Sequence, residues 1–101
     1  MTDRIVWRPE ALEEFEEAIA WYSERSIFAA EKLLTGFRAR LSDILANPQR
    51  FPFSIPDRRW ALLKTFPFQI HYMEDQNQIV ILAFWHEKRD RKTLQSRLRS
   101  V

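Results

Sequence analysis

Hydrophobic side chains recur at helical spacing through the first half of the chain. After a short β-prone run, Ile5 to Trp7, Pro9 indicates the start of a helix, since proline suits a first helical turn and cannot continue a strand ladder. The apolar stripe that follows consists of Leu12, Phe15, Ala18, Ile19 and Tyr22. A second stripe begins at about Ala29 and stops at Asn47-Pro48. The short link between the two stripes predicts a helical hairpin.

From Arg58 onward, apolar and polar residues alternate instead. Residues 58–64 are predicted to form one strand, and Phe68, Ile70 and Tyr72 define the buried side of a second strand. The segment 74–77 is a polar turn, and Ile79 to Trp85 is apolar on both sides, as a central strand is. The proline-rich segment 48–57 is predicted to be an ordered loop that aromatic side chains hold in place.

The element order predicts an α+β fold, β-α-α-β-β-β with a possible short C-terminal helix, in a single domain over residues 1–101. The helical hairpin must cover one face of a small, largely antiparallel sheet, because each has one apolar side to bury. The other face carries Gln69 and His71. We expect this face to be exposed and basic at its edges, and to hold the functional surface.

The C-terminal segment, His86 to Val101, is predicted to be the least stable element. Asp90 can cap a short basic helix there, but its inward anchors are only Leu94 and Leu98, with Val101 as a third candidate. Isolated helices below about 12–15 residues are marginal in water. Deletion of residues 93–101 is therefore expected to leave the domain folded. In the alternative, the two leucines complete the core and the same deletion unfolds the protein.

Composition excludes several classes of function. The 101 residues contain no cysteine, which excludes a disulfide scaffold and any thiolate chemistry and suits the reducing cytoplasm. The single glycine, Gly36, rules out a phosphate-binding loop, and its position predicts close packing of the two helices. Two histidines without a nearby carboxylate pair argue against a metal site, and no cofactor is expected. The longest apolar run is too short to span a membrane, and no signal peptide is recognisable.

Charge is distributed unevenly along the chain. Residues 1–57 carry 7 Lys/Arg and 10 Asp/Glu, whereas residues 58–101 carry 9 and 4. The basic second half predicts an acidic or polyanionic partner, with an ordinary solvated surface as the alternative. The candidate residues for binding a target or partner are Arg58, Arg59, Lys64, Lys88, Arg91 and Lys92.

Three further residues are candidates for catalysis. Metal-free cleavage of a phosphodiester needs a general base, a general acid and a cation on the phosphate. His71 and His86 can move protons, and Arg89 can supply the charge. The alternative for the histidines is a structural hydrogen-bonding role, and for Arg89 ordinary charge pairing. No spacing between these residues proves a catalytic site.

Several segments, in order and over roughly residues 4–92, resemble the RelE/ParE superfamily of toxins from bacterial type II toxin–antitoxin systems. They are residues 9–22, the loop Asn47–Pro52, the strand Arg58–Leu63, the segment Phe66–Tyr72 and the run Ile81–Asp90. The resemblance implies a small sheet with a helical hairpin, as the residue pattern does. It also implies a growth-inhibiting toxin that a cognate antitoxin neutralises.

The superfamily divides by target. RelE-like members cut messenger RNA on the ribosome, whereas ParE-like members inhibit DNA gyrase. Arg89 matches the RelE-type arginine after the last strand, but Gln69 and Gln95 stand where an arginine and a tyrosine are expected. The resemblance therefore slightly favours the ParE-like action on gyrase, with RelE-like mRNA cleavage as the alternative. A non-toxic adaptor that binds nucleic acid or protein is a further alternative.

Overall fold

The computed structural model describes residues 4–100 and follows the predicted order of elements. The elements are β1 (Ile5–Trp7), α1 (Pro9–Arg25), α2 (Ile27–Ala46), the 3₁₀ turn η2 (Pro48–Arg50), β2 (Phe53–Ile55), β3 (Arg58–Leu62), β4 (Phe68–Asp75), β5 (Gln78–His86) and α3 (Arg91–Arg99). The prediction of a loop through residues 48–57 missed β2. This strand has three residues between two prolines and pairs irregularly with β3, so no alternating pattern could develop.

The sheet has five strands in the order β1-β5-β4-β3-β2. β1 runs parallel to β5, with Ile5 opposite Ile79, and the other neighbouring pairs are antiparallel. The tight turn between β4 and β5 places Gln76 at φ 49° and Asn77 at φ 66°. Two consecutive positive φ angles match the right-handed twist of a hairpin, and asparagine tolerates them well. The largely antiparallel sheet is thus confirmed.

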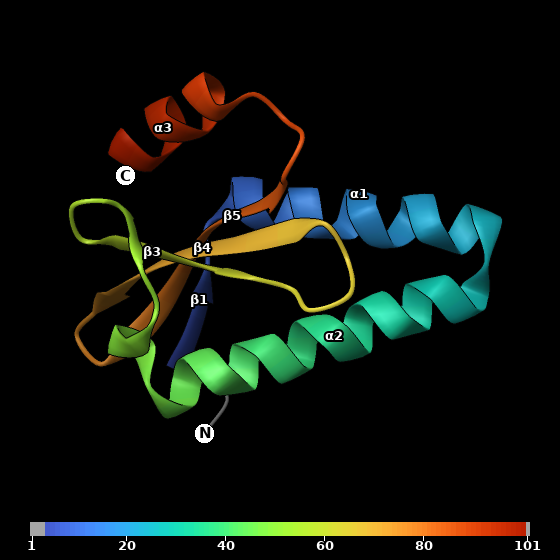
Figure 1. Cartoon of the computed structure of the whole chain (residues 1–101), viewed down its shortest axis with the longest axis horizontal. Helices are drawn as coiled ribbons and strands as arrows, with labels where there is room; N and C mark the ends of the chain where they lie inside the picture. The colour runs from blue at the N-terminus through green and yellow to red at the C-terminus, as the bar shows by residue number, and fades with distance from the viewer. Residues whose placement is uncertain (1–3, 101) are drawn as a thin grey trace.

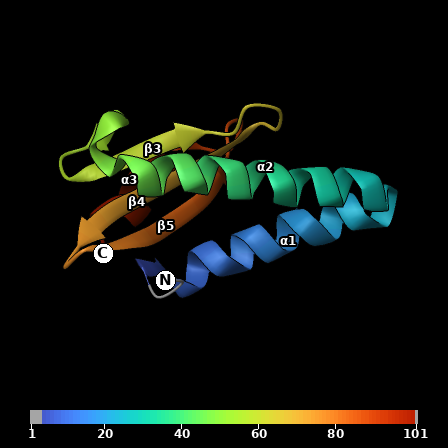
Figure 2. The ribbon, with the colours of Figure 1, turned by 90° about the horizontal axis from the view of Figure 1, so that it is seen from below.

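The two long helices form the predicted hairpin, and a single residue joins them. The backbone N–H of Ser26 donates to the carbonyl of Tyr22 at the end of α1, and its hydroxyl accepts the Ala29 N–H at 3.2 Å at the start of α2. One serine therefore ends one helix and caps the next. The joined ends project beyond the edge of the sheet (Figure 1), while both helices cover one of its faces (Figure 2).

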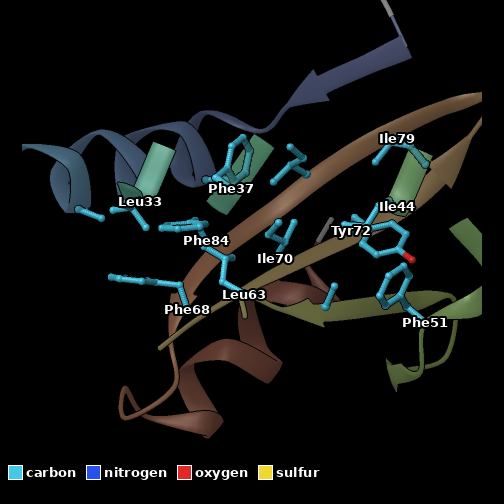
Figure 3. Close-up of a cluster of buried hydrophobic side chains, with 14 residues drawn as sticks. Leu33, Phe37, Ile44, Phe51, Leu63, Phe68, Ile70, Tyr72, Ile79 and Phe84 are labelled. Carbon is cyan, nitrogen blue, oxygen red and sulfur yellow. The ribbon is translucent and has the colours of Figure 1, made fainter. Parts of the chain in front are cut away.

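The main core lies between the hairpin and the sheet (Figure 3). Leu33, Phe37 and Ile44 of α2 point toward the strands, where Ile70 and Phe84 are fully or almost fully buried. This face of β4 is the one that alternation in the sequence assigned to the core. The register of the sheet is therefore fixed, because a shift by one residue would turn these apolar side chains to the other face.

The opposite face of the sheet is covered, so the prediction that it is exposed was wrong. α3 lies across it (Figure 1), and Leu94 and Leu98 pack on Val80, Leu82 and Trp85 in a second cluster. His71, which was expected on an open surface, is 2% exposed. The physical reason is the composition of β5, whose apolar residues on both sides require cover on both sides. This packing favours the alternative in which the two leucines complete the core.

Gly36 does not serve the close helix packing that its position predicted. A Cβ atom placed there would meet only the Leu63 side chain, at 3.9 Å, which is ordinary van der Waals contact. We expect Gly36→Ala to stabilise the protein by about 0.5–1 kcal/mol, because alanine restricts the unfolded chain and favours the helix. Urea denaturation of the variant beside the wild type measures this. A loss of stability would show that the helix needs glycine at this position.

Candidate functional site

Glu14 joins α1 to the end of the sheet and to α3. Its carboxylate accepts hydrogen bonds from Arg89 at 2.8 Å and from Arg97 at 2.9 and 3.0 Å. It also accepts the backbone N–H of Phe84 at 3.1 Å. Arg97 in turn donates to the Leu82 carbonyl at 2.8 Å. One carboxylate, only 11% exposed, thus holds two guanidinium groups from elements distant in sequence.

The end of β1 explains why a helix side chain bonds to a strand. β1 ends at Trp7. The next residue, Arg8, still donates its backbone N–H to the Ile81 carbonyl of β5. Beyond that point β5 has no neighbouring strand on this side. Because a buried N–H needs an acceptor, the Glu14 carboxylate takes the place of the missing strand at Phe84.

Sequence reasoning did not identify Glu14, although a signal was present. Ala11 and Ala18 are buried on α1, and Glu14 lies three residues after the first and four before the second. A helix places such positions on one face. A carboxylate between two small residues on the buried face requires a cationic or N–H partner. The partners themselves lie 70 or more residues away.

Arg89, the candidate phosphate-binding cation, is therefore engaged in the protein. It pairs with Glu14, and its guanidinium lies over the Trp85 ring at 3.9 Å from the ring centre. The side chain is still 47% exposed, so one side of it faces solvent. An arginine whose charge is already compensated has less electrostatic attraction left for a phosphate.

His71 is buried beneath α3 and has one hydrogen-bond partner. Its Nε2 lies 2.8 Å from the Gln69 side-chain oxygen, and its ring stacks near Trp60. Burial, together with the smaller effect of the positive charges of Arg91 and Arg97, lowers the pKa of His71 to about 4. The imidazole is consequently neutral near pH 7 and a weak base.

This pKa makes the stability of the fold dependent on pH. At pH values between the folded pKa of about 4 and the ordinary pKa of 6.5, His71 binds a proton in the unfolded chain but not in the folded protein. Stability therefore falls as the pH decreases, by about 2 kcal/mol from pH 7.5 to pH 5. Urea denaturation across this range measures the slope. His71→Gln should remove this part of the slope; an unchanged slope in the variant would contradict the assignment.

His86 lies at the end of β5 and has different surroundings. Its Nδ1 accepts the backbone N–H of Lys88 at 3.1 Å, and its ring meets the edge of Phe68. Together with Arg89 it borders a groove of about 290 Å³ between α1 and the ends of β4 and β5, with Trp21 and Tyr22 in the opposite wall. This groove is on the hairpin side of the sheet.

The structure does not bring the three catalytic candidates together. His86 is in phase with Phe84 and faces the hairpin, whereas His71 packs on the opposite face, under α3. Arg89 borders both the groove at His86 and a smaller cavity at His71. The sheet itself therefore separates the two imidazoles.

The six basic binding candidates lie in two settings. Arg59 donates to the Phe51 carbonyl at 2.7 Å and stacks on Phe53, and Arg58 donates to the Leu98 carbonyl at 3.3 Å, so both contribute to the fold. The other four are exposed. They are Lys64 in the β3–β4 connection, Lys88 in the β5–α3 connection, and Arg91 and Lys92 in the first turn of α3. A hydrogen bond from the Glu87 N–H to the Pro67 carbonyl, at 2.9 Å, joins the two connections.

An exposed apolar area at the hairpin tip was not predicted. Trp21, Ile27 and Phe28 lie where α1 meets α2, and the Phe28 side chain is 73% exposed. The Arg25 guanidinium covers one face of the Trp21 ring at 3.6 Å. Neighbouring large apolar groups on a surface often mark an interaction site. The helical pattern predicted which apolar residues of each helix are buried. It did not show which of the remaining apolar residues stay exposed.

Across residues 4–100, no three His, Asp or Glu side chains gather as ligands for a metal ion. No helix within the same range is long and apolar enough to cross a membrane.

Comparison with known proteins identifies the family. Residues 5–91 match the model of the ParE toxin of the type II toxin–antitoxin system, parDE. A structure titled "Chromosomal ParDE TA system from P. aeruginosa" superposes with a TM-score of 0.68 at 17% identity, covering 81% of this chain and 92% of that one.

The isolated E. coli RelE toxin superposes with a TM-score of 0.58 at 14% identity, covering 96% of this chain and 97% of that one. At these identities the likeness concerns the fold. A search among curated proteins finds no match. Since the family model spans most of the chain, the protein belongs to the ParE toxin family of type II toxin–antitoxin systems, within the RelE/ParE superfamily.

Proposed function

We propose that this toxin acts in the cytoplasm by binding and inhibiting DNA gyrase, and that a cognate antitoxin neutralises it. The observation that carries the proposal is that the sheet separates His71 from His86, while Arg89 is already paired with Glu14. A toxin without an assembled set of acid, base and cation acts by binding a target and not by chemistry on it.

Two requirements of metal-free RNA cleavage are poorly met, at His71 and at Arg89. A general base must reach the 2′-hydroxyl, but His71 is buried and its pKa of about 4 makes it a weak base. A cation must stabilise the developing phosphate charge, but Glu14 already pairs with Arg89. Gln69, which stands where the resemblance predicts an arginine, bonds to His71 and carries no charge. The match to the ParE family supports the gyrase assignment independently.

The antitoxin is proposed to dock on the basic end of the sheet and in the groove along α1. Lys64, Lys88, Arg91 and Lys92 are exposed there and suit an acidic segment. The groove of about 290 Å³ offers aromatic walls to apolar anchors of the same segment. A segment that wraps in this way should bury more than about 2,000 Å² in total. The name of the P. aeruginosa neighbour, a ParDE system, supports a partner of this kind.

The test compares two targets with one protein preparation. Purified toxin is added to a gyrase supercoiling assay and to a translation-coupled mRNA cleavage assay. We expect loss of supercoiling and intact mRNA. Intact supercoiling with cleaved mRNA would overturn the proposal, and cleavage lost on changing Arg89 to alanine would then assign the RelE-like alternative.

Expression of the toxin alone tests the remaining alternative. We expect growth arrest, and rescue by the neighbouring reading frame that encodes the antitoxin. Normal growth with soluble, folded protein would favour a non-toxic adaptor.

A further inference from the structure

The outer side of α2 carries an aromatic ring that faces solvent. Leu33, Phe37 and Ile44 turn the opposite side of this helix toward the sheet (Figure 3), and α2 runs along the outside of the molecule (Figure 2). Phe28 comes before Phe37 by about two and a half helical turns, so its ring points away from the core. Its side chain is the most exposed of the large apolar residues described, and such a group marks a surface available to a partner.

The same face offers a place for a ring of this size further along α2. Ala39, Ser42, Asp43 and Ala46 have the spacing i, i+3, i+4 and i+7, with which four residues of one helix surround a side chain of another. Both alanines and the serine are exposed and short, so a second helix can approach closely there. Ser42 follows Phe28 by two heptads, which puts both on the same side of the helix. One face thus carries a protruding ring and a matching site for it.

Two charged side chains lie between these positions, on one edge of the face. Glu31 and Arg38 are exposed and form no ion pair with any residue that the structure describes. They lie about 10 Å apart along the helix, too far to pair with each other. If two copies of α2 pack antiparallel about a two-fold axis at Thr35, Glu31 of each copy lies opposite Arg38 of the other. In the same register, Phe28 of each copy enters the four-residue site of the other, so the face is complementary to itself in shape and charge.

We propose that two copies of this toxin associate through the outer side of α2, as an antiparallel helix pair with Thr35 at the two-fold axis. Two phenyl rings and the helix surface between them bury about 1,000 Å² in total, at the lower end for specific interfaces. The dimer is therefore reversible, with a dissociation constant of about 1–100 µM. The groove along α1 is lined by residues of α1, β4, β5 and the β5–α3 connection, so the dimer leaves it open. The proposal does not rest on the gyrase assignment.

Sedimentation velocity of the full-length toxin, at concentrations of about 1–500 µM, measures the association. We expect a monomer–dimer equilibrium. Phe28→Ala should weaken it at least about tenfold, because a symmetric interface loses two rings at once. Trp21→Ala removes another exposed aromatic ring near the tip of the hairpin, outside this face, and should leave the dissociation constant unchanged. Thermal melts of both variants check that they remain folded.

Reversal of the two charges tests the register. Glu31→Arg and Arg38→Glu should each weaken the dimer about threefold to tenfold, because each places like charges opposite one another twice. The combined variant restores opposite charges and should associate as the wild type does. A mixture of the two single variants should form a heterodimer in preference to either homodimer.

Cysteine cross-linking locates the axis, since the chain has no cysteine of its own. Under mild oxidation, Thr35→Cys should join two copies by a disulfide, because the two side chains meet at the axis. Ser42→Cys lies on the same face, but its counterpart in the second copy is about 20 Å away, so this control should stay uncross-linked.

Three results would overturn the proposal. The first is a toxin that stays monomeric at the highest concentration; if Phe28→Ala then weakens binding of the antitoxin, the face belongs to the antitoxin. The second is an equal loss of association in Trp21→Ala and Phe28→Ala, which would move the contact to the hairpin tip. The third is failure of the combined charge reversal to restore the dimer, or cross-linking of Ser42→Cys as readily as Thr35→Cys, either of which would exclude the antiparallel register.

Discussion

Removal of residues 93–101 should abolish the cooperative unfolding transition of this toxin. The deletion takes away most of α3, including Leu94 and Leu98, which pack on Val80, Leu82 and Trp85. Loss of two buried leucines costs about 5 kcal/mol or more, which is comparable with the whole stability of a small domain. A thermal melt followed by near-ultraviolet circular dichroism measures the result, because the tryptophans report on tertiary packing.

Two point variants make this test specific to the buried side of α3. Leu98→Ala should lower the free energy of unfolding by about 2–4 kcal/mol, since this side chain is almost completely buried. Arg99→Ala changes the exposed neighbour and should alter stability by less than about 0.5 kcal/mol. A truncated protein that still melts cooperatively near the wild-type temperature would show instead that α3 is a dispensable, functional tail.

Glu14→Gln should destabilise the toxin by about 3 kcal/mol. The amide keeps the size of the side chain but removes the charge that holds Arg89 and Arg97, and it cannot accept all the hydrogen bonds that converge on the carboxylate. The Phe84 N–H and one guanidinium are then left underbonded in a partly buried site. Urea denaturation gives the free energy of unfolding directly.

Glu13→Gln is the matched control for this change. It alters the exposed neighbouring glutamate on α1 and should change stability by less than about 0.5 kcal/mol. Similar effects of the two variants would mean that the carboxylate cluster contributes no more than a surface ion pair does. The Arg97→Met variant provides a second check, because its effect should be much less than additive with that of Glu14→Gln.

Local sequence signals predicted most of the elements. Helical spacing and Pro9 located α1, and Asp90 caps α3 as expected, with its carboxylate accepting the Thr93 N–H at 3.0 Å. Alternation along β4 and the apolar run of β5 placed the two central strands. These features depend on neighbours within a few residues, so the order of residues is enough to reveal them. The short edge strand β2 depends on pairing with β3, and the pattern missed it.

The sequence alone also determined the family, because ordered segments along most of the chain carry it. Only the tertiary structure decided the environment of the candidate site residues. α3 covers His71, a carboxylate 75 residues away pairs with Arg89, and the sheet separates His71 from His86. Burial, charge compensation and orientation arise from contacts between distant segments, which periodicity does not encode. Residue type therefore showed which side chains could do chemistry, and packing decided which of them face a common, accessible surface.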